Sequence, residues 1–148
     1  MPATVPEVKK ALVAAGFDLY RTRANEVWVA ERVRDNLIMD SGVSVVLSGA
    51  SLIVRFVVRA QRSDFPGDGA SALFDRARCL AAAAEQRGFS ETTTTTCAVQ
   101  DPADETRTLD TWYEVSFERQ VAGLDDAMVE VRFALGLDKT VHADAQAT

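Results

Sequence analysis

One stretch decides the fold: Ser51–Gln61, SLIVRFVVRAQ, in which apolar side chains recur at every second position. The side chains of its apolar side are Leu52, Val54, Phe56, Val58 and Ala60. A period of two, built from branched and aromatic residues, is typical of a β-strand with one buried face. This stretch therefore predicts a strand that packs against a core.

The second clear strand lies at 111–121, where apolar residues again alternate with polar ones. Its polar side carries Glu114 and Glu118, and the less apolar side of the first strand carries Arg55 and Arg59. If both strands belong to one sheet, these opposite charges share its outer face, where cross-strand pairs stabilise a sheet.

Two helices are predicted from their caps and their periodicity. Thr4 stands three residues before Glu7, which is the spacing of a capping box, and Gly16 then ends the first helix. The second helix spans 69–87 and ends at Gly88. Its apolar stripe repeats at three-to-four spacing and consists of Leu73, Phe74, Ala77, Leu80, Ala81 and Ala84.

Shorter strands are predicted at 26–33, 43–47, 92–96 and 127–135, and a wide hairpin loop at 101–110. Two of these segments keep an alternative. In 26–33, Val29 and Val33 lie four apart, and Leu37 follows four residues later, so a helix over 26–38 stays open. Before 127–135, the pair Asp125-Asp126 would also start a helix, over about 124–136.

The order of elements predicts an α+β fold, an antiparallel sheet packed on one face by two helices. We expect a single domain over 1–139 and a flexible tail over 140–148. The two halves of the sequence share two short matches. One is at the ends of the two predicted helices, and the other is a Val-Arg-Phe triplet in each half. These matches suggest a pseudo-repeat of helix-then-strands. The matched segments are 15–17 with 87–89, and 54–56 with 131–133.

Composition limits the classes of partner. The chain has 148 residues, 47% hydrophobic and 26% charged, which suits one globular domain. Its net charge is -6, which argues against nucleic acid as a ligand. Residues 1–62 carry nine basic and six acidic side chains, whereas 63–148 carry seven and sixteen, so two halves of opposite sign can attract each other or a second copy. The absence of a signal-like or membrane-spanning stretch predicts a cytoplasmic protein without membrane contact.

Few residues suggest catalysis. The single histidine, His142, lies in the predicted tail, so no histidine-based catalytic set or metal site is expected. Cys79 and Cys97 match no metal-binding spacing and are predicted to be small buried side chains in a reducing compartment. The acidic residues within 101–105 do not fit a calcium loop. We therefore predict no catalytic residue, no metal and no cofactor, and we lean against an enzyme.

One segment, 21–40, has a residue mix typical of recognition, because Trp and Arg dominate the energetically important positions of protein interfaces. The candidate binding residues are Arg21, Arg23, Trp28, Arg32, Arg34, Asp35, Asn36 and Asp40. The competing interpretation is a solvated strand pair with internal salt bridges and Trp28 in the core. Exposure of Trp28 and Trp112 would favour a protein-binding face.

In size, acidity and element order, residues 4–136 resemble the small dimeric chaperones of type III secretion and the proteins that share their fold. The resemblance implies a homodimer that binds a polypeptide, and it implies a helix where the alternation at 127–135 predicts a strand. The leading hypothesis is thus a non-catalytic protein-binding module, adaptor or chaperone-like, that forms a homodimer. The alternative is a small-ligand-binding or enzymatic domain with a pocket between helices and sheet.

Overall fold

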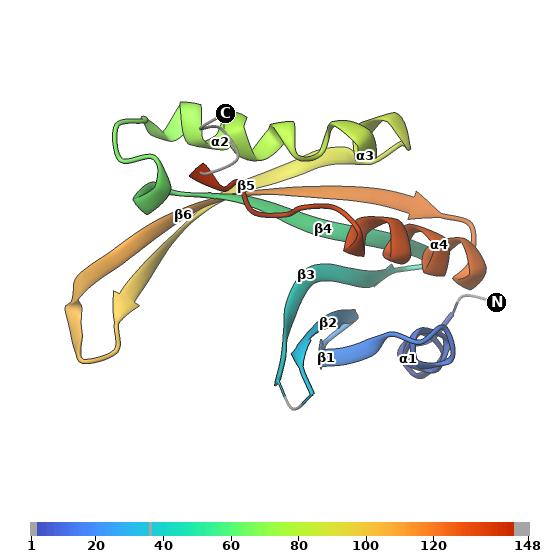
Figure 1. The fold of residues 1–148 in the computed structure, drawn as a ribbon. Coiled ribbons are helices and arrows are strands. Elements are labelled where there is room, and N and C mark those ends of the chain that lie inside the picture. The colour runs from blue at the N-terminus through green and yellow to red at the C-terminus, as the bar shows by residue number, and fades with distance from the viewer. Residues whose placement is uncertain (1–2, 36, 144–148) are drawn as a thin grey trace. The chain divides into compact units, whose positions relative to one another are not determined.

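The computed structural model describes residues 3–35 and 37–143. Within them, six strands form one antiparallel sheet in the order β1-β2-β3-β4-β6-β5 (Figure 1). The strands are β1 (Asp18–Arg23), β2 (Glu26–Arg34), β3 (Leu37–Ser48), β4 (Ser51–Gln61), β5 (Ser90–Asp101) and β6 (Asp104–Val121). The helices are α1 (Val5–Ala14), α2 (Ala70–Cys79), α3 (Ala82–Gln86) and α4 (Leu124–Leu135), with a short 3-10 helix η1 (Arg62–Asp64). The predicted α+β class is confirmed.

The chain divides into two compact units. Unit 1 comprises Met1–Phe56 and Glu118–Leu137, and unit 2 comprises Val57–Phe117 and Asp138–Thr148. The strands β4 and β6 run through both units. The division leaves the expected single domain a prediction.

In unit 1, α1 begins with the predicted capping box. The backbone N–H of Glu7 donates to Thr4 Oγ1 at 3.4 Å, and the Thr4 N–H donates to Glu7 Oε1 at 3.2 Å. Val8 and Leu12 are fully buried. Gly16 follows the helix with a φ of +93°, a left-handed conformation that glycine adopts without strain. The first helix is therefore confirmed at both ends.

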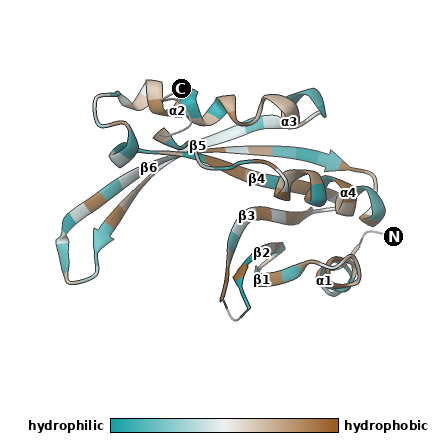
Figure 2. Cartoon of the chain, in the orientation of Figure 1, coloured by the Kyte–Doolittle hydropathy of each residue, from teal (hydrophilic) through white to brown (hydrophobic). Residues whose placement is uncertain are grey.

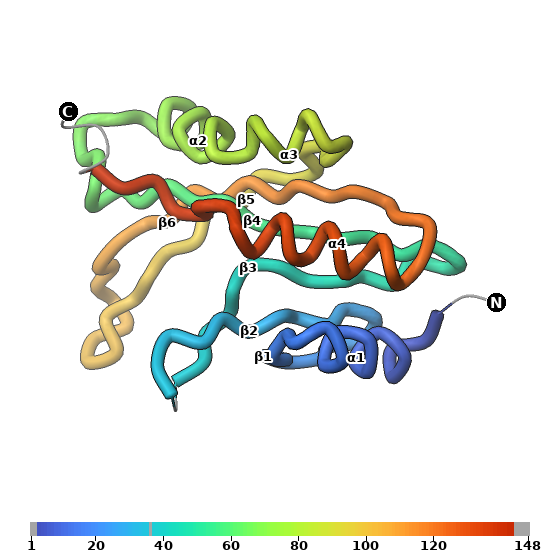
Figure 3. The backbone as a smooth tube through the Cα atoms, turned by 45° about the vertical axis from the view of Figure 1, so that its right-hand side comes forward, coloured from blue at the N-terminus to red at the C-terminus, as the bar shows by residue number. Residues whose placement is uncertain are grey.

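The strand predicted at 127–135 is wrong, because this segment is the helix α4. Its buried residues repeat at three-to-four spacing and are Ala127, Glu130, Val131 and Ala134. Val129, one of the alternating apolar residues, is instead 53% exposed. Burial follows the helical period, and the aspartates at 125 and 126 occupy the first turn, where the helix dipole favours negative charge. The helix runs along β3 (Figure 3).

The finding that 127–135 is a helix also weakens the predicted pseudo-repeat of helix-then-strands. The triplet 54–56 lies in a strand, whereas its counterpart 131–133 lies in a helix. Only the match at the helix ends keeps a structural parallel, since Gly16 and Gly88 have φ values of +93° and +97°.

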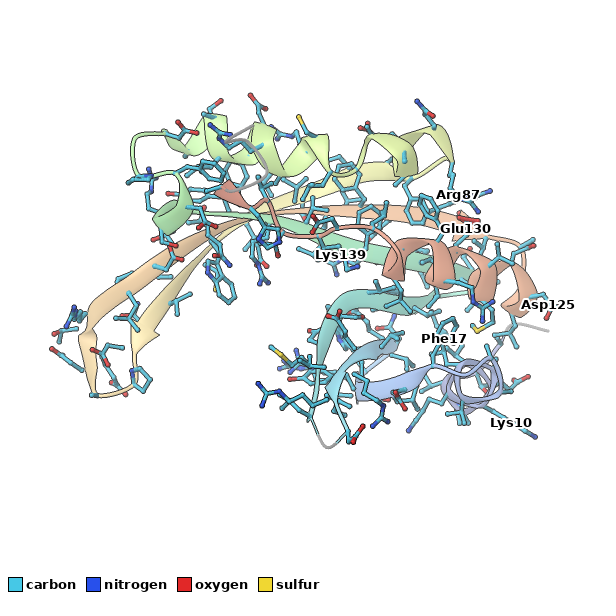
Figure 4. All side chains as sticks on the ribbon, in the orientation of Figure 1. Lys10, Phe17, Arg87, Asp125, Glu130 and Lys139 are labelled. Atoms are coloured by element: carbon cyan, nitrogen blue, oxygen red, sulfur yellow. The ribbon has the colours of Figure 1, made fainter. Side chains whose placement is uncertain are left out.

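Two arginines connect α4 to the rest of unit 1, and Figure 4 labels two of the residues that they contact, Phe17 and Glu130. Arg132 donates from Nη2 to the Ala15 carbonyl at 3.1 Å and lies 5.1 Å from the centre of the Phe17 ring. Arg119 Nη1 on β6 lies 2.9 Å from Glu130 Oε2, and Glu130 is only 5% exposed. The end of α1 and the strand β6 are thus both bonded to the same helix.

The alternation in β4 is confirmed along its whole length, with every second residue buried. The predicted meeting of charges is confirmed too. Arg59 Nη2 lies 2.7 Å from Glu114 Oε2 in unit 2, and Arg55 Nε lies 3.8 Å from Glu118 Oε2 in unit 1. Charged residues therefore pair between β4 and β6, although they are 55 or more positions apart in the sequence.

In unit 2, the helix predicted over 69–87 is broken into α2 and α3. The break lies at Leu80 and Ala81, whose backbone N–H groups bond to the carbonyls of Ala77 and Arg78, three residues earlier, each at 3.0 Å. This tighter turn still leaves one buried stripe, formed by Leu73, Ala77, Ala81 and Ala84. The apolar periodicity thus predicts the buried face but not the interruption.

The wide loop predicted at 101–110 is wrong. β5 and β6 continue almost to the end of the hairpin, and only Pro102 and Ala103 form the turn. Asp101 Oδ1 accepts a hydrogen bond from the Ala103 N–H at 2.9 Å, which fixes the turn, and β6 begins at Asp104. β3 is also longer than predicted, since it begins at Leu37. The patterns above leave β1 out altogether.

The first residues of the predicted tail are held against β4. The Val141 N–H donates to the Arg59 carbonyl at 2.9 Å, and Thr140 forms a parallel bridge with Arg59. Val141 is buried. The flexible tail expected over 140–148 stays a prediction, and 144–148 lie outside the described residues.

Candidate protein-binding surface

The candidate surface is built on the three strands β1, β2 and β3 of unit 1. β1 and β2 are joined by a two-residue turn in which Ala24 has a φ of +53°. The next residue, Asn25, anchors this turn to β3 through two hydrogen bonds. Its side-chain Nδ2 donates to the Leu47 carbonyl, and its backbone carbonyl accepts from the Leu47 N–H at 2.8 Å. The turn is therefore fixed to the sheet.

The predicted residues Arg21 and Trp28 lie opposite each other on β1 and β2. The Arg21 guanidinium carbon is 5.7 Å from the centre of the Trp28 ring and 5.9 Å from that of Tyr20. Trp28 is half-buried, whereas Arg21 is exposed. This stack is a cation–π contact at the rim of the sheet. Arg23, opposite Glu26, is also exposed.

Two of the predicted binding residues are bonded within the chain. Arg32 donates to both carboxylate oxygens of Asp18, at 3.1 and 3.3 Å, and to the Asp35 carbonyl at 2.9 Å. Asp40 Oδ1 accepts from the Gly42 N–H at 2.8 Å. The Arg32–Asp18 pair is an internal salt bridge of the kind that the competing interpretation predicts. Arg34 and Asp35 are exposed, and Asn36 lies outside the described residues.

The strongest feature of the β2–β3 hairpin is a group of apolar side chains that the sequence reasoning missed. We call Val33, Leu37, Ile38 and Met39 the apolar tip; these residues are 49%, 44%, 40% and 52% exposed. Among the described residues, eight large hydrophobic side chains are well exposed, and four of them are these. The hydrophobic colouring of this hairpin shows the same concentration (Figure 2).

Pairing with β2 places the apolar tip among charged residues. Leu37 pairs with Arg34, Ile38 with Arg32, and Met39 with Glu31. Because side chains alternate along a strand, Leu37 and Met39 face one side of the hairpin and Ile38 faces the other. Exposed apolar side chains rimmed by charges of both signs are typical of a protein-interaction site. The sequence does carry a signal for it, since Leu37-Ile38-Met39 are three consecutive apolar residues between the polar residues Asn36 and Asp40. A solvated strand does not require such a run.

The second tryptophan lies elsewhere, in unit 2. Trp112 is half-buried, and the Arg59 guanidinium carbon lies 3.9 Å from the centre of its ring. The same guanidinium also donates to Glu114, so Trp112 packs against the Arg59–Glu114 ion pair between β4 and β6. Neither tryptophan is fully exposed, and the apolar tip replaces them as the main candidate contact.

The two cysteines are exposed, so the prediction of buried thiols is wrong. Cys79 lies on α2 between the buried positions 77 and 81, on the side that faces away from the core. Cys97 lies in β5, where the neighbouring residues are exposed as well. Apolar neighbours in the sequence did not place either thiol in the core.

Chemically reactive groups do not converge in the part of the chain that the structure describes. There, no three His, Cys, Asp or Glu side chains gather in a way that could hold a metal ion. A pocket of about 450 Å³ beside α2 is lined in part by Cys79. Its charged groups already form ion pairs, Asp68 with Arg76 at 2.5 Å and Asp75 with Arg78 at 2.8 Å. The alternative of a small-ligand-binding or enzymatic domain stays a prediction.

None of the helices within residues 3–35 and 37–143 has the length and apolar composition needed to cross a bilayer. In comparisons with known proteins, no family model matches the sequence, and no curated protein or solved structure is significantly similar to it.

Proposed function

We propose that this protein is a non-catalytic polypeptide-binding module, adaptor or chaperone-like, that forms a homodimer in the cytoplasm. Its apolar tip holds an apolar segment of another polypeptide. The observation that carries the proposal is the exposure of Val33, Leu37, Ile38 and Met39, each by at least 40%, on one hairpin. Burying such side chains against a partner contributes about 25 cal/mol for each Å² of apolar surface removed from water.

The surroundings of the tip support a polypeptide partner. Arg34 and Asp35 stand exposed beside it, so a partner segment with an apolar centre and polar ends of either sign meets complementary groups. Arg21 and Trp28, stacked at 5.7 Å, add the residue types that contribute most at protein interfaces. The helix α4 also lies where the resemblance to secretion chaperones implies a helix, which supports the proposal further.

A library of short immobilised peptides that differ in apolar content tests the proposal. We expect wild-type protein to bind peptides with clustered Leu, Ile or Phe. The double variant Ile38→Asp/Met39→Asp should lose about tenfold in affinity or more, because two contacts are replaced by charges. The matched control is Leu109→Asp/Val129→Asp, which places the same charges at residues that are 51% and 53% exposed outside the tip.

The proposal is wrong if wild-type protein binds no peptide of the library, or if both double variants lose binding equally. Circular dichroism and thermal unfolding of each variant show whether the fold is retained. Selective loss in the tip variant alone supports the proposal.

A further inference from the structure

The strand β5 (Ser90–Asp101) forms one edge of the sheet, next to β6. All its residues are exposed except Val99 and Asp101, which are half-buried. Among the described residues, the backbone hydrogen bonds outside helices and strand ladders include none to 91–100. The outward N–H and C=O groups of β5 are thus presented to a further strand. The far end of its hairpin extends past α2 (Figure 1).

The β5 edge lacks the features that normally protect an edge. Residues 92–100, TTTTTCAVQ, contain no charge, no proline and no glycine, and the five threonines favour the extended conformation. Natural sheets guard their edges with charges, prolines, bulges or short strands, because an open edge pairs with other chains. Neither a charge nor a proline interrupts β5 over these nine residues.

The opposite edge, β1, is guarded. It is only six residues long, its register with β2 shifts between Leu19 and Arg21, and it carries two exposed arginines, Arg21 and Arg23. Of the two outermost strands of the sheet, only β5 is thus unguarded among the described residues. Pairing through one open edge closes after two copies, whereas two open edges would allow a growing filament.

We propose that β5 pairs antiparallel with β5 of a second copy, about a two-fold axis, and so joins two sheets into one. The proposal rests on the proposed function for the homodimer alone, and it uses a strand distant in sequence from the apolar tip. Threonine then meets mostly uncharged residues across the axis, and Thr–Thr pairs are favourable between antiparallel strands.

The charges at the ends of β5 do not oppose this pairing. Glu91 is bonded to Arg78 Nε at 2.8 Å, and Asp101 lies 3.9 Å from Arg107 Nη1. Glu91 thus meets the second copy already paired with Arg78, and Asp101 lies at the end of the strand near an arginine of its own chain. A partner strand that carries many positive or many negative side chains finds no complementary charge on 92–100. An uncharged partner strand is therefore favoured, and residues 92–100 of a second copy provide one.

The strand pairing has a salt dependence that separates it from charge attraction between the basic and acidic halves. Each copy has a net charge of -6, so two copies repel each other over long distances. Salt screens this repulsion and leaves backbone hydrogen bonds intact, so the dimer should hold or strengthen as salt rises. A dimer formed by opposite charges would dissociate instead.

The test combines sedimentation with matched lysine variants. Wild-type protein should be a dimer at low and high salt. Thr95→Lys should raise the dimer dissociation constant about fivefold or more, because charge on an edge strand opposes pairing. Thr108→Lys, the same change at an exposed position of β6, should leave it unchanged. A wild-type monomer at all concentrations overturns the proposal, and so does an equal effect of both lysines.

Cysteine cross-linking locates the axis. In a Cys79→Ser/Cys97→Ser background, single cysteines are introduced at Thr93, Thr94, Thr95 and Thr96, and native Cys97 is tested with Cys79→Ser alone. In an antiparallel pair, separation between equivalent residues grows by roughly 7 Å per position from the axis, so disulfide-linked dimers should form at one or two positions only. Absence of cross-links, or equal cross-linking at all positions, contradicts the proposal.

The two proposals fail separately. Ile38→Asp/Met39→Asp should leave the dimer intact, and Thr95→Lys should leave peptide binding by the apolar tip intact. Loss of peptide binding in the tip variant together with a wild-type monomer would overturn the strand pairing and keep the polypeptide-binding function.

Discussion

Arg59 on β4 donates to Glu114 on β6 from both Nε and Nη2, at 3.1 and 2.7 Å, although 55 positions separate the two residues. Four residues earlier on β4, Arg55 meets Glu118, which is four residues later on β6. The opposite directions of these steps are those of antiparallel strands. One register therefore accounts for both ion pairs, and it can be inferred from the spacing of the charges alone.

The Arg59–Glu114 pair should contribute measurably to stability. Its side chains are only 30% and 19% exposed, and the guanidinium also covers the Trp112 ring. A double-mutant cycle with Arg59→Met and Glu114→Gln, measured by urea unfolding, should give a coupling free energy of about 1 kcal/mol. The cycle for Arg107 and Asp101, which are 3.9 Å apart with Arg107 69% exposed, serves as control and should give a coupling near zero. Equal coupling in both cycles would contradict this account.

Gly16 should not tolerate a side chain. Its φ is +93°, so Gly16→Ala should lower the free energy of unfolding by about 1 kcal/mol, although the added methyl group meets no atom within 4 Å. Gly67→Ala is the matched control, because Gly67 also has open space but lacks the positive φ. We expect the control to be neutral or slightly stabilising. A loss of similar size at both positions would show that φ is not the cause.

Asp110 should make stability depend on pH. Burial opposes ionisation of its carboxyl group, but hydrogen bonds from the Ser63 hydroxyl and N–H outweigh this effect and hold the pKa of Asp110 below its ordinary value. A lowered folded-state pKa stabilises the protein above the unfolded-state pKa, and this contribution is lost as pH falls through the folded-state pKa. Asp110→Asn should therefore destabilise at pH 7 and lose its effect in acid, below about pH 4. Chemical unfolding across this range measures it, and a pH-independent effect would refute the assignment.

Glu130 should be sensitive to loss of its charge. It is 5% exposed and its Oε2 lies 2.9 Å from Arg119 Nη1, so Glu130→Gln removes the charge that pairs with this guanidinium. The expected cost is about 1–3 kcal/mol in thermal or urea unfolding. Glu105→Gln, on the exposed part of β6, should change stability by no more than about 0.5 kcal/mol. If Glu130→Gln were as mild as this control, the pair would have no structural role.

The sequence predicts those parts of the fold in which burial imposes a clear period. β4 and α1 follow from alternation and from a capping box, each a local signal. α4 was predicted wrongly because Val129 and Val131 both fit an alternating pattern, while burial selects Val131 alone and leaves Val129 exposed. When some residues of an alternating pattern are small or exposed, the pattern fits a strand and a helix about equally well. The choice then depends on which residues contact the core, and the sequence alone does not give this.

The candidate surface was predicted only in part. The tryptophan and arginines of 21–40 predict a binding segment there, but Arg32 is bonded to Asp18 within the chain. The apolar tip was not among the predicted binding residues. Exposure is a tertiary property, and a branched residue such as Val33 reads in the sequence as a core residue. Only the unbroken apolar run 37–39 indicates exposed apolar side chains, because three successive residues cannot all face the buried side of a strand.

Hydrogen exchange tests the central claim, that the apolar tip binds polypeptide, most directly. The amides of 31–40 are followed by mass spectrometry with and without the strongest peptide from the immobilised library. The account predicts that saturating peptide slows exchange in this segment in wild-type protein and in Leu109→Asp/Val129→Asp, and that Ile38→Asp/Met39→Asp shows no such change. Protection confined to other segments, or unchanged exchange over 31–40 in wild-type protein with peptide bound, would contradict it.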